Sequence, residues 1–386
     1  MENKKQYSYL KVLFFMRYLG DAFFFSFLQL FLAYKGLSEI NIAFINSLRP
    51  MLVLLMNPFF GLISKDVNKN RRIMQIITII EGILVAFITK FDIFVVLTIF
   101  VSLISMLDSP FYTLLDGFTV SFTHESKFKY SNIRVFGSLA YVFGNLFGGL
   151  AIDFLGYEVT FIISGLFMIF TGLSIFFVKP LNKLDHNENK EVEKGNYKEI
   201  LKNPSFYLYL LIYIGIVTFP GIGDSFISLY FLNSGLGTKE YGIIASLMIV
   251  VEVLTMYLYG KLGNKANDKT VYIIIGIAYG LRSLLIGLDL PTYVTIPASL
   301  LRGVAWGLIL CVHANYLRKI VGTKNVTGAI FILVLVSSIV QLVFLNVAGY
   351  ILEKISYSYL YLGISLITIL TTIFVVFTSK NIKTNQ

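Results

Sequence analysis

This sequence has few charged residues and almost no cysteine. Only 14% of its 386 residues are charged, against roughly 25% in soluble domains, whereas 56% are hydrophobic. The single cysteine, Cys311, lies in an apolar run, so a disulfide framework is excluded. No HExxH, GxSxG or Walker-type motif is present, and His124, His186 and His313 are too scattered for a metal site. We therefore expect neither an enzyme nor a bound metal or cofactor.

Apolar runs of about 20 residues, each long enough to span a bilayer, recur along the whole sequence. They predict an all-α integral membrane protein with twelve transmembrane helices. The predicted helices cover residues 8–34, 41–64, 71–91, 93–117, 132–152, 158–178, 205–233, 239–262, 270–288, 292–317, 325–350 and 356–378.

The net charge of +10 is explained by the positions of the basic residues. If the odd-numbered connections lie outside, only Lys35, Lys90, Lys239 and Lys354 face that side. Apart from five Arg inside helices, the remaining Lys and Arg then lie on the cytoplasmic side, as the positive-inside rule requires. We therefore expect a multi-pass protein of the cytoplasmic membrane with both termini in the cytoplasm. The positive charge does not indicate a nucleic-acid partner.

A long polar stretch and an internal repeat divide the sequence into halves. Residues 179–204 form the polar stretch, so we predict a six-helix bundle at 1–178, a cytoplasmic linker at 179–204 and a second six-helix bundle at 205–386. "GLISKDVNKNR" after the second predicted helix is matched by "GKLGNKANDKT" 199 residues later, after the eighth. Gly36 and Gly235 precede these segments with the same spacing. The halves are therefore predicted to be pseudo-symmetric.

These loop segments resemble the helix 2–3 motif of the major facilitator superfamily. The residues that carry the resemblance are Gly61, Lys65, Asp66 and Arg71, and again Gly260, Asn264, Lys265 and Lys269. The first copy has its acid one position late, and the second has Asn in that place. A hydrated, positive-inside turn is the alternative interpretation. The resemblance implies the major facilitator fold, with a solute site at the membrane midplane between two six-helix repeats.

Leaving aside lysines and the first two positions of each predicted helix, eleven carboxylate and guanidinium side chains fall inside the helices. Each costs roughly 2.5 kcal/mol or more if it faces lipid. The six acids and five bases are Asp21, Glu81, Asp108, Asp116, Asp224, Glu252, Arg17, Arg49, Arg134, Arg282 and Arg302. Nearly equal numbers predict ion pairs in the interior, with one surplus acid. We expect about half of these residues only to hold helices together, first among them Arg49, Glu81 and Asp108. A histidine satisfied by a neighbour is the favoured interpretation of His313.

The segment "LLDGFTVSFTHESKFKYSNIRVFGSLAYVFGN", residues 114–145, resembles the lactose permease branch, which includes nucleoside and phenylpropionate permeases. That resemblance implies that Asp116 and Arg134 grip solute hydroxyls and that Tyr141 offers an aromatic face. It also places Arg282 where those permeases keep a coupling arginine. The coupling histidine and glutamate of their tenth helix are missing here, because those positions hold Arg302 and Ala305.

Two further groups of charges complete the predicted site. Arg17 and Asp21, four residues apart on one helix face, are expected to line the solute pathway; the alternative is an i,i+4 salt bridge that only eases insertion. Proton coupling is assigned to a rearranged set, with Asp21, Asp224 or Glu252 as the acid and Arg282 or Arg302 as the base. The favoured members are Glu252, Asp224, Arg282 and Arg302.

The predicted function is secondary active transport of a small polar solute, sugar-like or nucleoside-like, by proton symport and alternating access. An aspartate and an arginine beside a tyrosine suit a neutral polyol. The alternatives are a proton-coupled carrier of an aromatic or organic acid, a drug or metabolite exporter, and a membrane sensor without flux. The expected partners are the solute, protons and lipid, and the resemblance implies a monomer.

Overall fold

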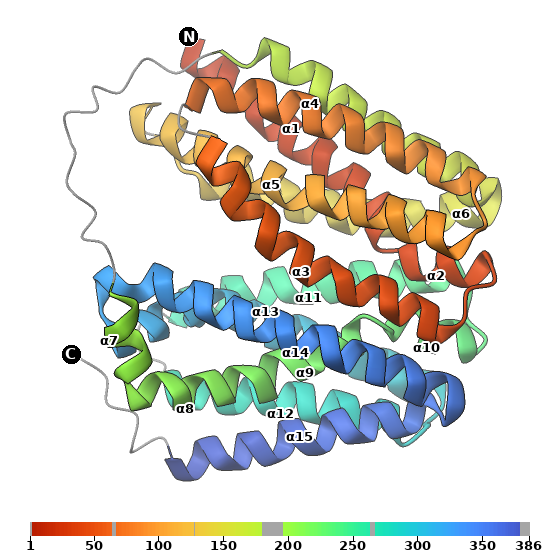
Figure 1. Cartoon of the computed structure of the whole chain (residues 1–386), viewed down its shortest axis with the longest axis vertical. Coiled ribbons are helices and arrows are strands. Elements are labelled where there is room, and N and C mark those ends of the chain that lie inside the picture. The colour runs from red at the N-terminus through yellow and green to blue at the C-terminus, as the bar shows by residue number, and fades with distance from the viewer. Residues whose placement is uncertain (1, 64–66, 127, 180–195, 263–266, 379–386) are drawn as a thin grey trace. The chain divides into compact units, whose positions relative to one another are not determined.

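The computed structural model describes residues 2–63, 67–126, 128–179, 196–262 and 267–378 of the chain, and its regular structure there is helical (Figure 1). The helices of the first part of the chain are α1 (Glu2–Phe25), α2 (Leu28–Tyr34), α3 (Glu39–Ile63), α4 (Val67–Phe87), α5 (Phe94–Ser126) and α6 (Ser131–Ser174). Those after the polar stretch are α7 (Tyr197–Lys202), α8 (Pro204–Tyr213), α9 (Phe219–Asp224), α10 (Ile227–Asn233), α11 (Thr238–Leu262), α12 (Asp268–Gly287), α13 (Thr292–Val321), α14 (Val326–Lys354) and α15 (Tyr357–Thr378). Short turns join them at η1 (Ile88–Lys90), η2 (Ile175–Phe177), η3 (Ile214–Thr218) and η5 (Thr323–Asn325).

Eleven helical stretches of the described chain are long and apolar enough to cross a membrane. One of them, Ser131–Phe177, has 47 residues. At 1.5 Å per residue it is about 70 Å long, more than twice the hydrocarbon thickness of about 30 Å. Its backbone leaves helical geometry at Gly156, where φ is 78° and ψ is 171°, a conformation that costs glycine little. This stretch therefore supplies two crossings, and the prediction of twelve transmembrane helices in an all-α fold is confirmed.

The internal repeat extends to the helix boundaries. Helices α3 and α11 each have 25 residues, and both ends of α11 lie 199 residues after those of α3. The short helices α2 and α10 differ by the same offset, as do the glycines that follow them, Gly36 with φ 79° and Gly235 with φ 84°. The two halves thus repeat in local backbone geometry as well as in composition.

The predicted single helix over 205–233 is wrong in detail, because this stretch divides into α8, α9 and α10. A π-helical turn, η3, separates α8 from α9. It lies just before Pro220, which lacks a backbone N–H and so cannot complete an α-helical ladder. A second break follows at Ser225 and Phe226, before α10 begins. Hydropathy is continuous across both breaks and therefore does not reveal them.

The chain forms two compact units. Unit 1 comprises Met1–His186 with Phe231–Ser246, and unit 2 comprises Asn187–Tyr230 with Leu247–Gln386. The boundary between the two units at His186 and Asn187 falls inside the predicted linker, 179–204. The predicted bundle limits, 1–178 and 205–386, stay predictions.

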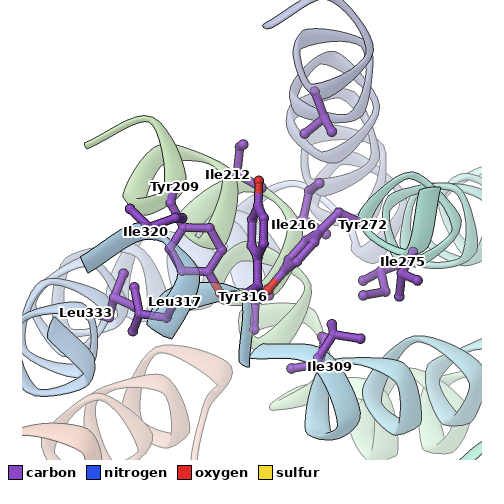
Figure 2. Packing of buried hydrophobic residues seen from close by; sticks show 14 of the residues in the cluster. Tyr209, Ile212, Ile216, Tyr272, Ile275, Ile309, Tyr316, Leu317, Ile320 and Leu333 are labelled. Carbon is purple, nitrogen blue, oxygen red and sulfur yellow. Dashed lines mark hydrogen bonds between the residues drawn. The ribbon is translucent and has the colours of Figure 1, made fainter. Parts of the chain in front are cut away.

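Each unit has its own aromatic-rich core. In unit 1, Phe14, Phe111 and Phe118 are almost completely buried in one cluster. In unit 2 the core includes Tyr209 and Tyr272, whose hydroxyl oxygens lie 2.6 Å apart (Figure 2). Tyr209 also lies 2.6 Å from Nδ1 of His313, so this histidine has the satisfying neighbour that was expected.

The short helix α7 is attached to unit 2 through Asn325, which ends η5. Its side-chain oxygen accepts a hydrogen bond from the backbone N–H of Asn196 at 2.9 Å, and its side-chain nitrogen donates to Glu199 at 3.1 Å. Asn196 in turn caps α7 by accepting from the N–H of Lys198. The hydrogen bond from Asn325, with the nearby Lys324 ammonium, lowers the pKa of Glu199 below its ordinary value.

Candidate functional site in two charge clusters and an aromatic grip

Four helices of unit 1 contribute side chains to one buried ion-pair network around Arg17, which we call the Arg17 cluster. It contains Arg17 and Asp21 from α1, Arg49 from α3, Glu81 from α4 and Asp108 from α5. Nη2 of Arg17 lies 2.9 and 2.8 Å from the two oxygens of Glu81 and 3.1 Å from Asp108. Nη1 of Arg17 donates to Asp21. One guanidinium therefore joins α1, α4 and α5.

The surroundings of Arg17 are dry and aromatic. Arg17, Asp21 and Glu81 are 0% exposed, and Asp108 is 7% exposed. The guanidinium carbon lies 4.8 Å from the ring centroid of Phe111, a cation–π contact that suits a desolvated arginine. Oxygens of the three acids lie within 4.8 Å of one another, and the guanidinium of Arg17 bonds to all three.

This geometry places Arg17 and Asp21 away from any described surface. The i,i+4 pair that the sequence left as an alternative is present, and contact between either residue and a solute would require a rearrangement. Arg49, Glu81 and Asp108, the residues first expected to hold helices together, are all engaged in ion pairs here. Arg49 lies at the edge of the cluster, since its side chain is 37% exposed and its Nη2 is 3.3 Å from Asp108.

Two of the three residues of the predicted solute grip contact a residue that the sequence analysis missed, Tyr18 of α1. The guanidinium of Arg134 stacks over the Tyr18 ring, 4.6 Å from its centroid. Tyr141 meets the same ring edge-on, with centroids 5.8 Å apart. Asp116 accepts a hydrogen bond from the hydroxyl of Tyr130 at 2.7 Å rather than pairing with Arg134.

Two further residues, Gly137 and Tyr130, affect the geometry and hydrogen bonding of this grip. Gly137, one turn after Arg134 on α6, leaves the space for the stack: a Cβ there would lie 2.8 Å from Nη1 of Arg134 and 3.2 Å from the Tyr18 ring. Tyr130, just before α6, stays neutral because burial and its hydrogen bond to Asp116 raise its pKa. It therefore remains a hydrogen-bond donor. Tyr130 lies four residues before Arg134, a spacing that could have identified it.

The four residues assigned to coupling do come together in unit 2, in what we call the Asp224 cluster. Asp224 of α9 lies between two arginines, 2.5 Å from Nη1 of Arg282 on α12 and 3.0 Å from Nε of Arg302 on α13. Glu252 of α11 is 3.7 Å from Nη1 of Arg302. Arg282 is completely buried, and although it pairs with Asp224 by charge, none of its nitrogens makes an aligned hydrogen bond to a described residue.

The loop motif is only partly visible. Lys65, Asp66, Asn264 and Lys265 lie outside the described residues. In each half, the base that follows contacts a backbone carbonyl near the end of that half's last helical segment: Nη2 of Arg71 is 3.5 Å from Phe176 O. Nζ of Lys269 likewise donates to Val376 O at 3.0 Å. Cations are favoured at such carbonyl ends of helices. Gly61 and Gly260 each lie two residues before the end of the helix that precedes the motif.

Comparison with known proteins identifies the class. A mutant of the nucleoside transporter NupG has the same fold, with a TM-score of 0.82 at 14% identity over 96% of this chain and 99% of that one. A bacterial homologue of the lysosomal transporter Spinster matches with a TM-score of 0.67 at 13% identity over 98% and 95% of the two chains. The chain therefore shares the fold of these two membrane transporters.

Within that class, residues 7–337 match the MFS_1 like family, and the chain belongs to it. The uncharacterized transporter YwbF of Bacillus subtilis is 23% identical over 331 residues, which is 83% of this chain and 80% of YwbF. The sucrose permease of Escherichia coli is 23% identical over 272 residues, which is 68% of this chain and 65% of the permease.

Proposed function

We propose that this protein is a secondary active transporter that moves a small polar solute, sugar-like or nucleoside-like, across the cytoplasmic membrane by proton symport. The observation that carries the proposal is that Arg134 and Tyr141 contact the Tyr18 ring while Asp116 lies close enough to Arg134 to interact with it by charge. A carboxylate and a guanidinium make charge-assisted hydrogen bonds to hydroxyls, and the exposed part of an aromatic cluster packs on a ring.

The relatives support the same solute class. One relative is named for sucrose and one structural neighbour for nucleosides. Both solutes combine a ring with several hydroxyl groups and carry no charge. Such a solute needs directional hydrogen bonds more than a counter-ion, which fits a grip with one acid and one base.

Coupling is assigned to the exchange of ion-pair partners in the Asp224 cluster. In alternating access, the ion pairs between α9, α11, α12 and α13 would exchange partners as solute and proton bind and leave. Asp224 is suited to this exchange, because it is shared between two guanidinium groups. Replacement Glu252→Gln should uncouple the carrier, so that solute exchange persists while uphill accumulation fails.

A second candidate, carriage of an aromatic or organic acid, is favoured by one observation. Arg282 is fully buried and has N–H groups that no described residue accepts. A solute carboxylate would supply the missing acceptor with a bidentate contact.

The test uses purified protein in liposomes that contain a pH-sensitive dye. Monosaccharides, disaccharides, nucleosides and aromatic acids are added separately. We expect proton movement with the sugars or nucleosides, its loss in Arg134→Gln, and its retention in the matched control Arg318→Gln, which removes an exposed arginine in the last turn of α13. A response only to aromatic acids would favour the second candidate. Solute binding without flux would contradict transport and indicate a sensor.

A further inference from the structure

The eleven intramembrane charges divide into three groups with different charge balance. The Asp224 cluster has two acids and two bases. The grip has one of each, Asp116 and Arg134. The Arg17 cluster has three acids and two bases. The surplus acid that the sequence left unplaced therefore belongs to the Arg17 cluster, the most buried of the three.

The hydrogen bonds of the Arg17 cluster show which acid is in excess. Both oxygens of Glu81 accept from Arg17. Asp108 has one oxygen on Arg17 and the other on Arg49. Asp21 accepts from Arg17 through Oδ1 only, and its Oδ2 is buried without a partner in the described chain. A carboxylate oxygen that is both buried and unpaired is strongly disfavoured when ionised.

Other ionisable groups face Asp21 from every neighbouring helix. They are Arg17 and Tyr18 on α1, Arg49 on α3, Glu81 on α4, Asp108 and Tyr112 on α5, and Tyr141 on α6. The three tyrosines are neutral when protonated, so they do not change the net charge of the cluster. Two positive charges therefore face three carboxylates, of which two are fully buried and the third is 7% exposed.

We propose that the Arg17 cluster holds one exchangeable proton at rest, on Oδ2 of Asp21, and that this is the proton which moves with the solute. The second part rests on the proposed function. With the proton bound, the cluster is electrically neutral. When the O–H bond of Asp21 breaks, water at the edge of the cluster takes the proton. That edge is the half-exposed Arg49 and its partner Asp108. The Asp224 cluster, already balanced, then exchanges partners without holding a proton at rest.

The test is infrared spectroscopy of the purified full-length protein at neutral pH, with no solute present. A protonated carboxylic acid has a carbonyl band separate from that of carboxylates, and it shifts in heavy water. We expect this band in the wild type and its loss in Asp21→Asn, which mimics the protonated side chain. The band should remain in the matched control Glu158→Gln, which removes an acid paired with Lys90 outside the cluster.

A second variant keeps the test decisive if Asp21→Asn fails to fold. Arg49→Gln removes the half-exposed base, leaves three acids with one base, and should roughly double the band. No band in the wild type, or a band that neither variant changes, would overturn the proposed site. The dye assay distinguishes the proton site from the proposed transport. A band without solute-driven proton movement would refute symport but leave a proton site in unit 1. Proton movement that persists in Asp21→Asn would show that the moving proton is held elsewhere.

Discussion

The replacement Arg17→Gln tests whether the Arg17 cluster holds unit 1 together. It removes the one arginine that forms an ion pair with Glu81 among the described residues, whereas Asp108 keeps Arg49. Removing one partner of a buried ion pair costs about 3–5 kcal/mol, because the remaining charge stays buried and uncompensated. A change of 1 kcal/mol shifts the melting temperature of a domain of this size by about 2–4 °C. We therefore expect the melting temperature in detergent, measured by differential scanning calorimetry, to fall by on the order of 10 °C.

Two further variants make this measurement specific. The double replacement Arg17→Gln with Glu81→Gln removes a charge of each sign and should recover much of the loss. Lys90→Gln breaks an ion pair with Glu158 that is about half exposed on both sides, and exposed pairs contribute only about 0–1 kcal/mol. An Arg17→Gln protein that melts with the wild type, or a double variant no more stable than the single one, would refute the reasoning.

Two other predictions concern the grip and the attachment of α7. Gly137→Ala would place a methyl group 2.8 Å from Arg134, so we expect solute affinity to fall about tenfold or more while the melting temperature changes little; unchanged affinity in a binding titration would show that the stack on Tyr18 is dispensable. Asn325→Ala removes the hydrogen bond that lowers the pKa of Glu199. A carboxyl group whose pKa is lowered by folding stabilises the fold fully above its ordinary pKa, and this stabilisation is lost as the pH falls through the folded-state pKa. We therefore expect hydrogen exchange in α7 to become faster in the wild type on acidification. In the variant it should already be faster at neutral pH. Equal exchange in α7 at both pH values would contradict this.

The positions of the helices could be predicted because the bilayer imposes one length on every crossing. Runs of about 20 apolar residues and the offset of 199 residues were enough to identify twelve crossings and two repeats. The structure carries that offset through to both ends of α3 and α11. The interruptions could not be predicted in the same way. The π-turn η3 depends on backbone hydrogen bonding before Pro220. Neither this turn nor the break at Phe226 interrupts the apolar run in the sequence.

The pairing of the buried charges was beyond the sequence for a different reason. Six acids and five bases can pair in many ways, and only a pair on one helix, such as Arg17 with Asp21, has a partner set by spacing. Which acids from α4 and α5 reach Arg17 depends on how these helices pack. Tyr18 was missed because one tyrosine among 24 carries no signal in composition. Tyr18 directly follows Arg17, so helical geometry places it on a different face of α1 from the Arg17 and Asp21 pair.

The use of arginine for every base of the two clusters follows from their geometry. Arg17 reaches three carboxylates from three helices through two nitrogens. Arg302 uses Nε for Asp224 and Nη1 for Glu252, and so joins α9 and α11 to α13. A lysine has one nitrogen at the end of a flexible chain and gives up its proton when buried, whereas a guanidinium stays charged and directs several N–H groups at once. Arginine therefore lets a single side chain fix several helices, which limits how many charges the bilayer has to accommodate. In such a network, a surplus carboxylate can exchange its proton without releasing the helices that the arginine holds.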